Sequence, residues 1–285
     1  MNLIIQGLQV DTPTLKTIAK TAAASTIDKI DSTTPYEAFA LRHVNKTPEL
    51  LAALDKLCAP AQLDYALIAD DLQLSDFKLV TMDMDSTVIT IECIDEIADM
   101  CGLKKEVSAI TEAAMRGEIK DFSESLTRRV ALLQGLDASA LERVYNERLQ
   151  LSMGAEAMLD AIQAQGSKSL LVSGGFTFFT ERLQPRLNLT YTRANTLEII
   201  DGKLTGKVLG TIVDGNEKAA TVRQVCNELG IGTHEALVMG DGANDLTMMG
   251  LAGLSVAFRA KPVVRQQASV AFNYVGLDGV LNLFA

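Results

Sequence analysis

The pattern of hydrophobic and polar positions divides the chain into two parts at a polar stretch, residues 70–76. Before it, short alternating segments and helically spaced segments follow one another, which suggests a β-α-β-β-α-β unit. The segments expected there are strands at 3–8, 36–44 and 63–68 and helices at 14–24 and 48–57. Pro13, just before the first helical spacing, is typical of a helix start. The pattern therefore predicts a small α+β domain over residues 1–75.

Four short apolar runs follow this unit, and polar residues that are candidates for catalysis or binding come directly after three of them. The runs cover residues 77–82, 169–172, 236–239 and 253–258. Continuous apolar strands separated by helices are typical of a parallel sheet that is buried on both faces. Polar residues just past such strands lie where open α/β sheets bind ligands. The pattern thus predicts a doubly wound α/β core over residues 76–285.

Two segments interrupt this core. The helical block at about residues 94–165 is rich in Ala, Leu, Met, Glu and Arg, and it indicates a helical cap inserted between the first two strands. Residues 196–205 are typical of a β-hairpin, with Asp201 and Gly202 as its turn.

The composition and net charge argue against two classes of binding partner, nucleic acids and anionic membranes. The 285 residues are 48% hydrophobic and carry a net charge of −10. An acidic protein is poorly suited to bind nucleic acid or an anionic membrane surface, because both need a basic face. No apolar run is long enough for a membrane-spanning helix, and the first residues lack the basic region of a signal peptide. The four cysteines form no CxxC pair, so we expect a reduced, cytoplasmic protein.

Asp83 and Asp85 follow the first apolar run. Alternate residues of an extended segment point the same way, so both carboxylates would face one pocket. Two such acids cannot both ionise easily unless a cation lies between them or one keeps its proton. One could then attack phosphorus while its neutral neighbour protonates the leaving alkoxide. Taken alone, an Asp-x-Asp segment is more typical of a solvated loop.

Two glycine-containing turns follow later runs. Residues 240–245 place acids where a hard cation such as Mg²⁺ would need oxygen ligands. Ser173 and the following glycines could hold phosphate oxygens with a hydroxyl and backbone N–H groups. Plain glycine turns are the alternative at both places. With only His43 and His234 in the chain, a serine-hydrolase triad is a poor interpretation.

Three charged residues are candidates for binding a charged substrate. Lys218, at the start of a helical stretch, could neutralise an aspartate and a phosphoryl group together. Glu92 and Arg129 carry opposite charges, which would suit a zwitterion if both reach one cleft. Each of the three, taken alone, is more typical of a solvated surface charge.

Together these segments resemble the phosphoserine phosphatases of the haloacid dehalogenase (HAD) superfamily, over about residues 77–271. The motifs that carry the resemblance stand in the family's order, at residues 83–98, 125–130, 172–176 and 240–245. The resemblance implies a HAD-like fold and Mg²⁺-dependent hydrolysis of O-phosphoserine to serine and phosphate. It also implies an aspartyl-phosphate intermediate and a place at the last step of serine biosynthesis.

The resemblance also implies roles for individual residues. Asp83 would be the nucleophile and Asp85 the acid and base. Asp83, Asp241 and the backbone carbonyl of Asp85 would hold Mg²⁺. Asn244 and Asp245 would support the phosphoryl group and the water shell of the metal.

The substrate-binding residues implied by the resemblance match the three charged groups of phosphoserine. Glu92 would bind the ammonium group, Arg129 would bind the carboxylate, and Phe122 would close the pocket. Arginine can grip a carboxylate with two parallel N–H···O bonds. The residues that would hold the phosphoryl group are Ser173, Gly174 and Lys218.

Other interpretations stay open at this point. A related phosphatase or phosphotransferase could act on another small phosphomonoester, and a receiver domain also phosphorylates an aspartate, although it lacks a cap. The first 75 residues resemble the ACT-like regulatory domains in element order alone, so serine binding there is only a conjecture. The expected partner is a small-molecule substrate, and the sequence is compatible with a homodimer.

Overall fold

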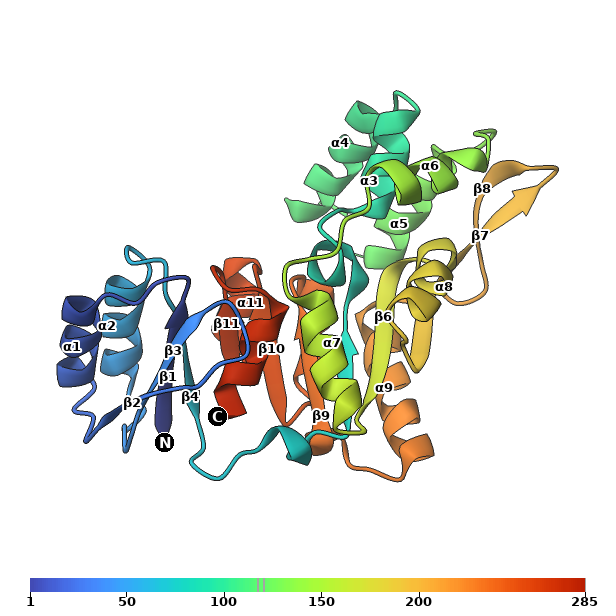
Figure 1. Ribbon diagram of the computed structural model, residues 1–285. Helices are drawn as coiled ribbons and strands as arrows, with labels where there is room; N and C mark the ends of the chain where they lie inside the picture. Colours follow the sequence, from blue (N-terminus) through green and yellow to red (C-terminus); the bar gives the residue numbers. More distant parts are fainter. Residues whose placement is uncertain (117, 120, 285) are drawn as a thin grey trace.

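The computed structural model describes residues 1–116, 118–119 and 121–284 (Figure 1). Its first part is an α+β domain with the expected element order. The elements are β1 (Asn2–Gly7), α1 (Thr12–Thr21), β2 (Ile27–Lys29), β3 (Glu37–Leu41), α2 (Pro48–Cys58) and β4 (Asp64–Ile68). The strands form an antiparallel sheet in the order β2-β3-β1-β4. The predicted α+β domain is therefore confirmed.

The two helices of this domain begin where the local sequence favours a helix start. The Asp11 side chain accepts the Thr14 N–H at 2.9 Å, and Pro13 lies in the first turn of α1. Thr47 caps α2 in the same way by accepting the Leu50 N–H at 3.2 Å. A side-chain oxygen at this position satisfies a backbone donor that has no partner within the helix.

The second part is built on a seven-stranded sheet in the order β11-β10-β9-β5-β6-β7-β8. Its strands are β5 (Leu79–Met82), β6 (Lys168–Phe176), β7 (Tyr191–Ile200), β8 (Lys203–Leu209), β9 (Ala236–Gly240), β10 (Leu254–Phe258) and β11 (Val270–Phe272). Neighbouring strands are parallel except β7 and β8, which form the expected hairpin. The four predicted apolar runs are β5, β6, β9 and β10, so the parallel sheet is confirmed.

Helices cover both faces of this sheet. They are α7 (Ala155–Ala164), α8 (Thr177–Arg186), α9 (Gly215–Leu229), α10 (Leu246–Met249) and α11 (Pro262–Gln267), followed by the C-terminal turns η5 (Leu277–Phe284). Alternate residues of β5 point to opposite faces: Val80 packs in the cluster with α7 and α8, whereas Leu79 packs in the cluster with α9, α10 and α11. This alternation gives the strand a continuous apolar sequence.

The inserted helices are α3 (Cys93–Met100), α4 (Lys104–Met115), α5 (Phe122–Ala131) and α6 (Ser139–Glu147). Figure 1 shows them as a group above the sheet, beyond the ends of β5 and β6. The helix α7, which the sequence placed within a cap ending at 165, instead contacts β6 and η5. Helical periodicity identifies an apolar face but not the surface that it covers. We therefore propose that the cap ends before α7.

The two parts share one apolar core. The face of the N-terminal sheet opposite α1 and α2 packs against the C-terminal segment, and Ile4, Ala38 and Ala40 belong to the same cluster as Val280 and Leu283. The edge strands β4 and β11 also contact each other. Within the described residues, no helix has both the length and the apolarity needed to cross a bilayer.

Candidate active site

The turn after β5 carries the two predicted carboxylates. It comprises Asp83 and the turn η2, Met84–Val88. The Asp83 Oδ1 atom accepts the Met84 N–H at 2.7 Å, and Ser86 adopts a left-handed backbone with φ of 55°. Both Asp83 and Asp85 line one cavity of about 840 Å³, at the edge of the sheet that the cap covers. Both acids therefore reach one pocket, but through a tight turn and not through the extended segment that the alternation assumed.

A buried lysine joins the catalytic turn to the second acidic loop. The Lys218 Nζ atom lies 2.8 Å from Asp83 Oδ2 and 2.7 Å from Asp245 Oδ1, and Lys218 is 0% exposed. Lys218 lies in the first turns of α9, which begins where Asp214 Oδ1 accepts the Glu217 N–H at 2.8 Å. The ammonium group is thus fixed between two carboxylates with no access to water.

The acidic groups of this site outnumber their cationic partner. Carboxylate oxygens of Asp83, Asp241 and Asp245 lie within 4.8 Å of one another. Burial, followed by the charges of Asp245 and Glu92, raises the pKa of Asp241 to about 7. Burial and the charge of Asp245 also raise the pKa of Asp83. An excess of buried negative charge on oxygen ligands is the environment that a hard divalent cation neutralises.

Within this cluster Asp245 accepts from three donors among the described residues, whereas Asp83 is engaged by two, the Met84 N–H and Lys218. In Asp245, Oδ1 faces Lys218, and Oδ2 accepts the backbone N–H groups of Asp241 at 3.2 Å and Gly242 at 3.0 Å. The Asp241 Oδ1 atom accepts only the Thr87 hydroxyl, at 3.2 Å. Asp241 therefore has the most carboxylate oxygen left for a cation in this cluster, while Asp245 organises the loop beside it.

Asp85 has the environment of a proton donor. Its Oδ2 accepts the Cys93 N–H at 3.2 Å, whereas its Oδ1 is buried with no hydrogen-bond partner among the described residues. Burial, followed by the charge of Glu92, raises the pKa of Asp85 to about 8. The raised pKa therefore favours the protonated carboxyl near neutral pH, as a proton donor requires.

The last part of β6, where its pairing with β7 shifts register between Val172 and Phe176, leaves room for a bound group. The Ser173 Oγ atom accepts the Gly175 N–H at 2.9 Å. A Cβ atom at Gly174 would lie 2.7 Å from the Phe122 ring, so only glycine fits beneath that ring. The Asn195 side chain, on β7, holds this part of β6 in place: it donates to the Gly174 carbonyl at 2.8 Å and accepts the Val213 N–H at 2.8 Å.

The cap contributes the opposite wall of the cavity. Glu92 precedes α3, and its Oε1 accepts the Ser86 hydroxyl at 2.7 Å. Arg129 lies on α5, where its Nε donates to the Ser125 carbonyl at 3.4 Å, and Phe122 begins the same helix. Opposite charges thus face one cavity from two helices of the cap.

Nearly all residues selected from the sequence line this single cavity. Lys218 and Asp245 lie behind its wall and contact Asp83 or each other instead. Sequence reasoning missed several residues at the site, namely Thr87, Asp95, Asn195 and Lys261. The sequence could have indicated Asp95, because it is an acidic residue only three positions after Glu92, in the first turn of the helix that follows.

The parallel sheet, the carboxylate turn after β5 and the inserted cap define a haloacid dehalogenase-like hydrolase, and the sequence model of that family matches residues 80–250. Within this class, the chain belongs to the phosphoserine phosphatase family. The predicted fold and family are therefore confirmed. The cap and the family membership together exclude the receiver-domain alternative.

Three similar proteins illustrate the match. A phosphoserine phosphatase of Polaromonas sp. is 54% identical over 232 residues, which cover 79% of this chain and 98% of the relative. The structure of a HAD-family hydrolase from Salmonella enterica serovar Typhi has a TM-score of 0.89 at 35% identity, covering 99% of this chain and 98% of its own. The structure of a phospho-aspartyl intermediate analogue of phosphoserine phosphatase has a TM-score of 0.68 at 36% identity, and the match covers 73% of this chain and 99% of the other.

Proposed function

We propose that the chain hydrolyses O-phosphoserine to serine and phosphate through an aspartyl phosphate at Asp83, the last step of serine biosynthesis. Membership of the phosphoserine phosphatase family gives the activity and the phospho-aspartyl route. The roles of individual residues rest on one observation: Asp83 and Asp85 line the same cavity but have different electrostatic environments. Asp83 is paired with Lys218, whose charge favours the carboxylate against the effects of burial and Asp245, while burial and Glu92 raise the pKa of Asp85 to about 8 and favour its protonated form.

Magnesium is the cofactor that we propose for this site. Asp83, Asp241 and the backbone carbonyl of Asp85 would hold it, and the excess of buried carboxylates over Lys218 supports a divalent cation there. Oxygen-only ligands favour Mg²⁺ over softer metals. When bound, the ion would neutralise negative charge on the phosphoryl oxygens and on the nucleophile.

In the first half-reaction, a carboxylate oxygen of Asp83 attacks phosphorus and the bond from phosphorus to the serine Oγ breaks. Asp85 gives its proton to that oxygen, so serine leaves as a neutral alcohol. Expulsion of an unprotonated alkoxide would be far slower, and general acid catalysis typically contributes about 10²–10⁴-fold. The products are free serine, an aspartyl phosphate and an ionised Asp85.

The second half-reaction regenerates both acids. The ionised Asp85 removes a proton from a water molecule whose oxygen attacks phosphorus, and the bond to the Asp83 oxygen breaks. Inorganic phosphate leaves, Asp83 becomes a carboxylate again, and Asp85 is protonated for the next cycle. The free Oδ1 atom of Asp85 supports this exchange, because no protein donor competes for it among the described residues.

Recognition of the serine part is assigned to the cap. Arg129 would bind the carboxylate, Glu92 would bind the ammonium group, and Phe122 would close over the substrate. Charge-assisted hydrogen bonds of this kind contribute about 1.5–3 kcal/mol each, enough to discriminate against phosphates without an amino-acid end. The groups proposed to hold the phosphoryl group are Ser173, Gly174 and Asn244 at the cavity wall, and Lys218 through its contact with Asp83, which would carry that group.

The chain is further proposed to divide into an ACT-like domain over residues 1–75 and a catalytic unit over 76–285. The Polaromonas relative supports this division, because 98% of that protein aligns with only 79% of this chain. The cytoplasmic location and the homodimer stay predictions.

A phosphate-release assay over small phosphomonoesters tests the proposed function. Phosphoserine should be the best substrate, ahead of glycerol phosphate and an aryl phosphate, and a chelator should abolish its turnover until Mg²⁺ is restored. Equal rates on all substrates would refute the assignment of phosphoserine. Full activity in chelator would refute the proposed metal.

A further inference from the structure

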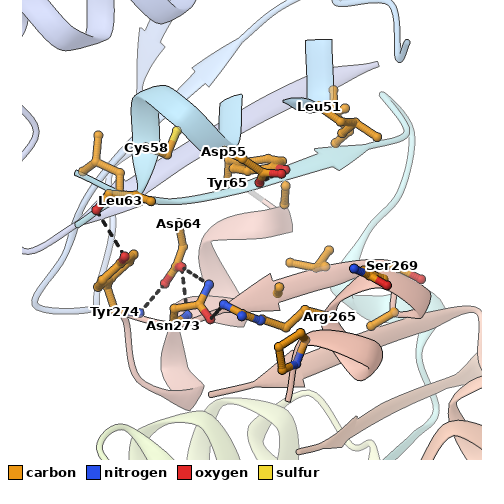
Figure 2. A pocket seen from close by; sticks show the side chains of 18 of the residues that line it. Leu51, Asp55, Cys58, Leu63, Asp64, Tyr65, Arg265, Ser269, Asn273 and Tyr274 are labelled. Atoms are coloured by element: carbon orange, nitrogen blue, oxygen red, sulfur yellow. Dashed lines mark hydrogen bonds between the residues drawn. The ribbon is translucent and has the colours of Figure 1, made fainter. Parts of the chain in front are cut away.

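The C-terminal segment, residues 273–284, is held by two buried side chains of the N-terminal domain. Asp64, which is 2% exposed, accepts the backbone N–H groups of residues 273–275 at 2.8, 2.8 and 2.9 Å. Figure 2 shows this carboxylate between β4 and the chain that follows β11. Tyr36, which is 3% exposed, accepts the Gly276 N–H at 2.8 Å through its hydroxyl. Four successive backbone donors are therefore fixed by the other domain.

The same segment holds a second piece of chain, residues 150–153, which we call the strap. The Leu277 N–H donates to the Met153 carbonyl at 2.8 Å. The two backbones lie so close that a Cβ atom at Gly276 would collide with Met153, and one at Gly154 would collide with Asp278. Backbone packed on backbone leaves little freedom for one segment to move without the other.

The strap in turn holds the catalytic turn. The Ser152 N–H donates to the Val88 carbonyl at 2.9 Å, and the Thr90 N–H donates to the Gln150 carbonyl at 2.9 Å. The Val88 N–H donates to the backbone carbonyl of Asp83 at 3.3 Å. A continuous series of hydrogen bonds therefore runs from the N-terminal domain, through the C-terminal segment and the strap, to the residue that bears the nucleophile.

We propose that Tyr36 and Asp64 are positioning residues for the hydrolysis: by fixing the C-terminal segment and the strap, they set the placement of Asp83 and Asp85. This inference rests on the proposed function of those two acids. Proton and phosphoryl transfer depend on sub-ångström placement, and a displacement of about 1 Å from a distant change can cost about 10²-fold in rate. The cap residues that would bind the serine part lie outside this series, so chemistry should suffer more than binding.

The test compares two conservative variants in the same domain. Tyr36→Phe removes one hydroxyl and keeps the ring in the core. The control is Tyr65→Phe, because the Tyr65 hydroxyl donates to Asp55 at 2.8 Å within the N-terminal domain and holds no part of the C-terminal segment. Well below both melting temperatures, Tyr36→Phe should lower kcat by roughly threefold to tenfold, with KM for phosphoserine nearly unchanged. Tyr65→Phe should leave both values unchanged.

Two further readouts separate positioning from simple stabilisation. Tyr36→Phe should also lower kcat on an aryl phosphate, since Asp83 is the nucleophile for both substrates. Asp64→Asn turns an amide group toward the backbone donors, so it should also lower kcat with KM for phosphoserine nearly unchanged. Its control is Asp55→Asn, which should leave both values unchanged. A lower melting temperature with unchanged kcat would overturn the proposal, as would a loss confined to KM. A parent protein that does not hydrolyse phosphoserine would refute the proposed function instead.

Discussion

Replacing Lys218 by methionine tests the buried charge arrangement behind the nucleophile. Methionine nearly preserves the volume of the side chain and removes its charge. Burial alone would lower the pKa of Lys218, but Asp245 and Asp83 together raise it above the usual range, so the lysine is charged when the protein folds. Its loss leaves two buried carboxylates without their cation. Removing one partner from such a group typically costs about 3–5 kcal/mol of unfolding free energy.

The pH dependence of that loss has a defined sign. Burial and Asp245 raise the pKa of Asp83, and without Lys218 that carboxyl has a still higher pKa in the folded state than in the unfolded state, so the folded state binds more protons. The stability deficit of Lys218→Met should therefore shrink as pH falls and grow as pH rises through the raised carboxyl pKa. Urea unfolding in chelator measures this, with Lys16→Met, at an exposed position on α1, as the control. A Lys218→Met protein as stable as its parent at every pH would refute the reasoning.

Three further predictions concern the chemistry and the shape of the cavity. Arg129→Ala should lose about 10- to 100-fold in kcat/KM on phosphoserine, because a charge-assisted bond contributes about 1.5–3 kcal/mol, and little on an aryl phosphate; equal losses would contradict its role. Since burial and Glu92 raise the pKa of Asp85 to about 8, phosphoserine turnover should fall as pH rises through that value and the acid loses its proton. An aryl phosphate, whose leaving group needs no proton, should show no such fall in its rate of phosphoenzyme formation, and a parallel decline would argue against this donor. In Gly174→Ala, the new Cβ would lie 2.7 Å from Phe122, so KM for phosphoserine should rise, and an unchanged KM would mean that the ring does not cover the substrate.

The sequence predicted the parts of the fold whose hydrophobic pattern is strong. Buried strands such as β5 and β9 are continuous apolar runs, and their polar ends located Asp83 and Asp241 at one edge of the sheet. The predicted unit includes a second strand, but the residues of β2 were not located and β11 was missed, because each has three residues, too few for a period to emerge. The helix α7 was assigned to the cap because its spacing does not reveal which surface it covers.

Individual site residues differ in how far the sequence alone could identify them. Lys218 carries no spacing signal: its place at a helix start made it a candidate, but the family resemblance was needed to favour that role over a solvated surface charge before the structure placed it against Asp83. Asn195 is one polar residue within a strand, and its function in holding Gly174 depends on a hydrogen bond across 21 positions. Contacts between segments far apart in the chain determine such roles, and a local pattern does not contain them.

The central claim, that Asp83 becomes phosphorylated in each turnover, is tested most directly by trapping the covalent intermediate. Rapid acid quenching during turnover of phosphoserine, followed by borohydride reduction and peptide mapping, would convert a phospho-aspartate into homoserine at its position. The account predicts homoserine at residue 83, and none when the substrate is omitted. A modification at Asp85 or Asp241 instead, or single-turnover release of phosphate with no trapped adduct, would contradict it.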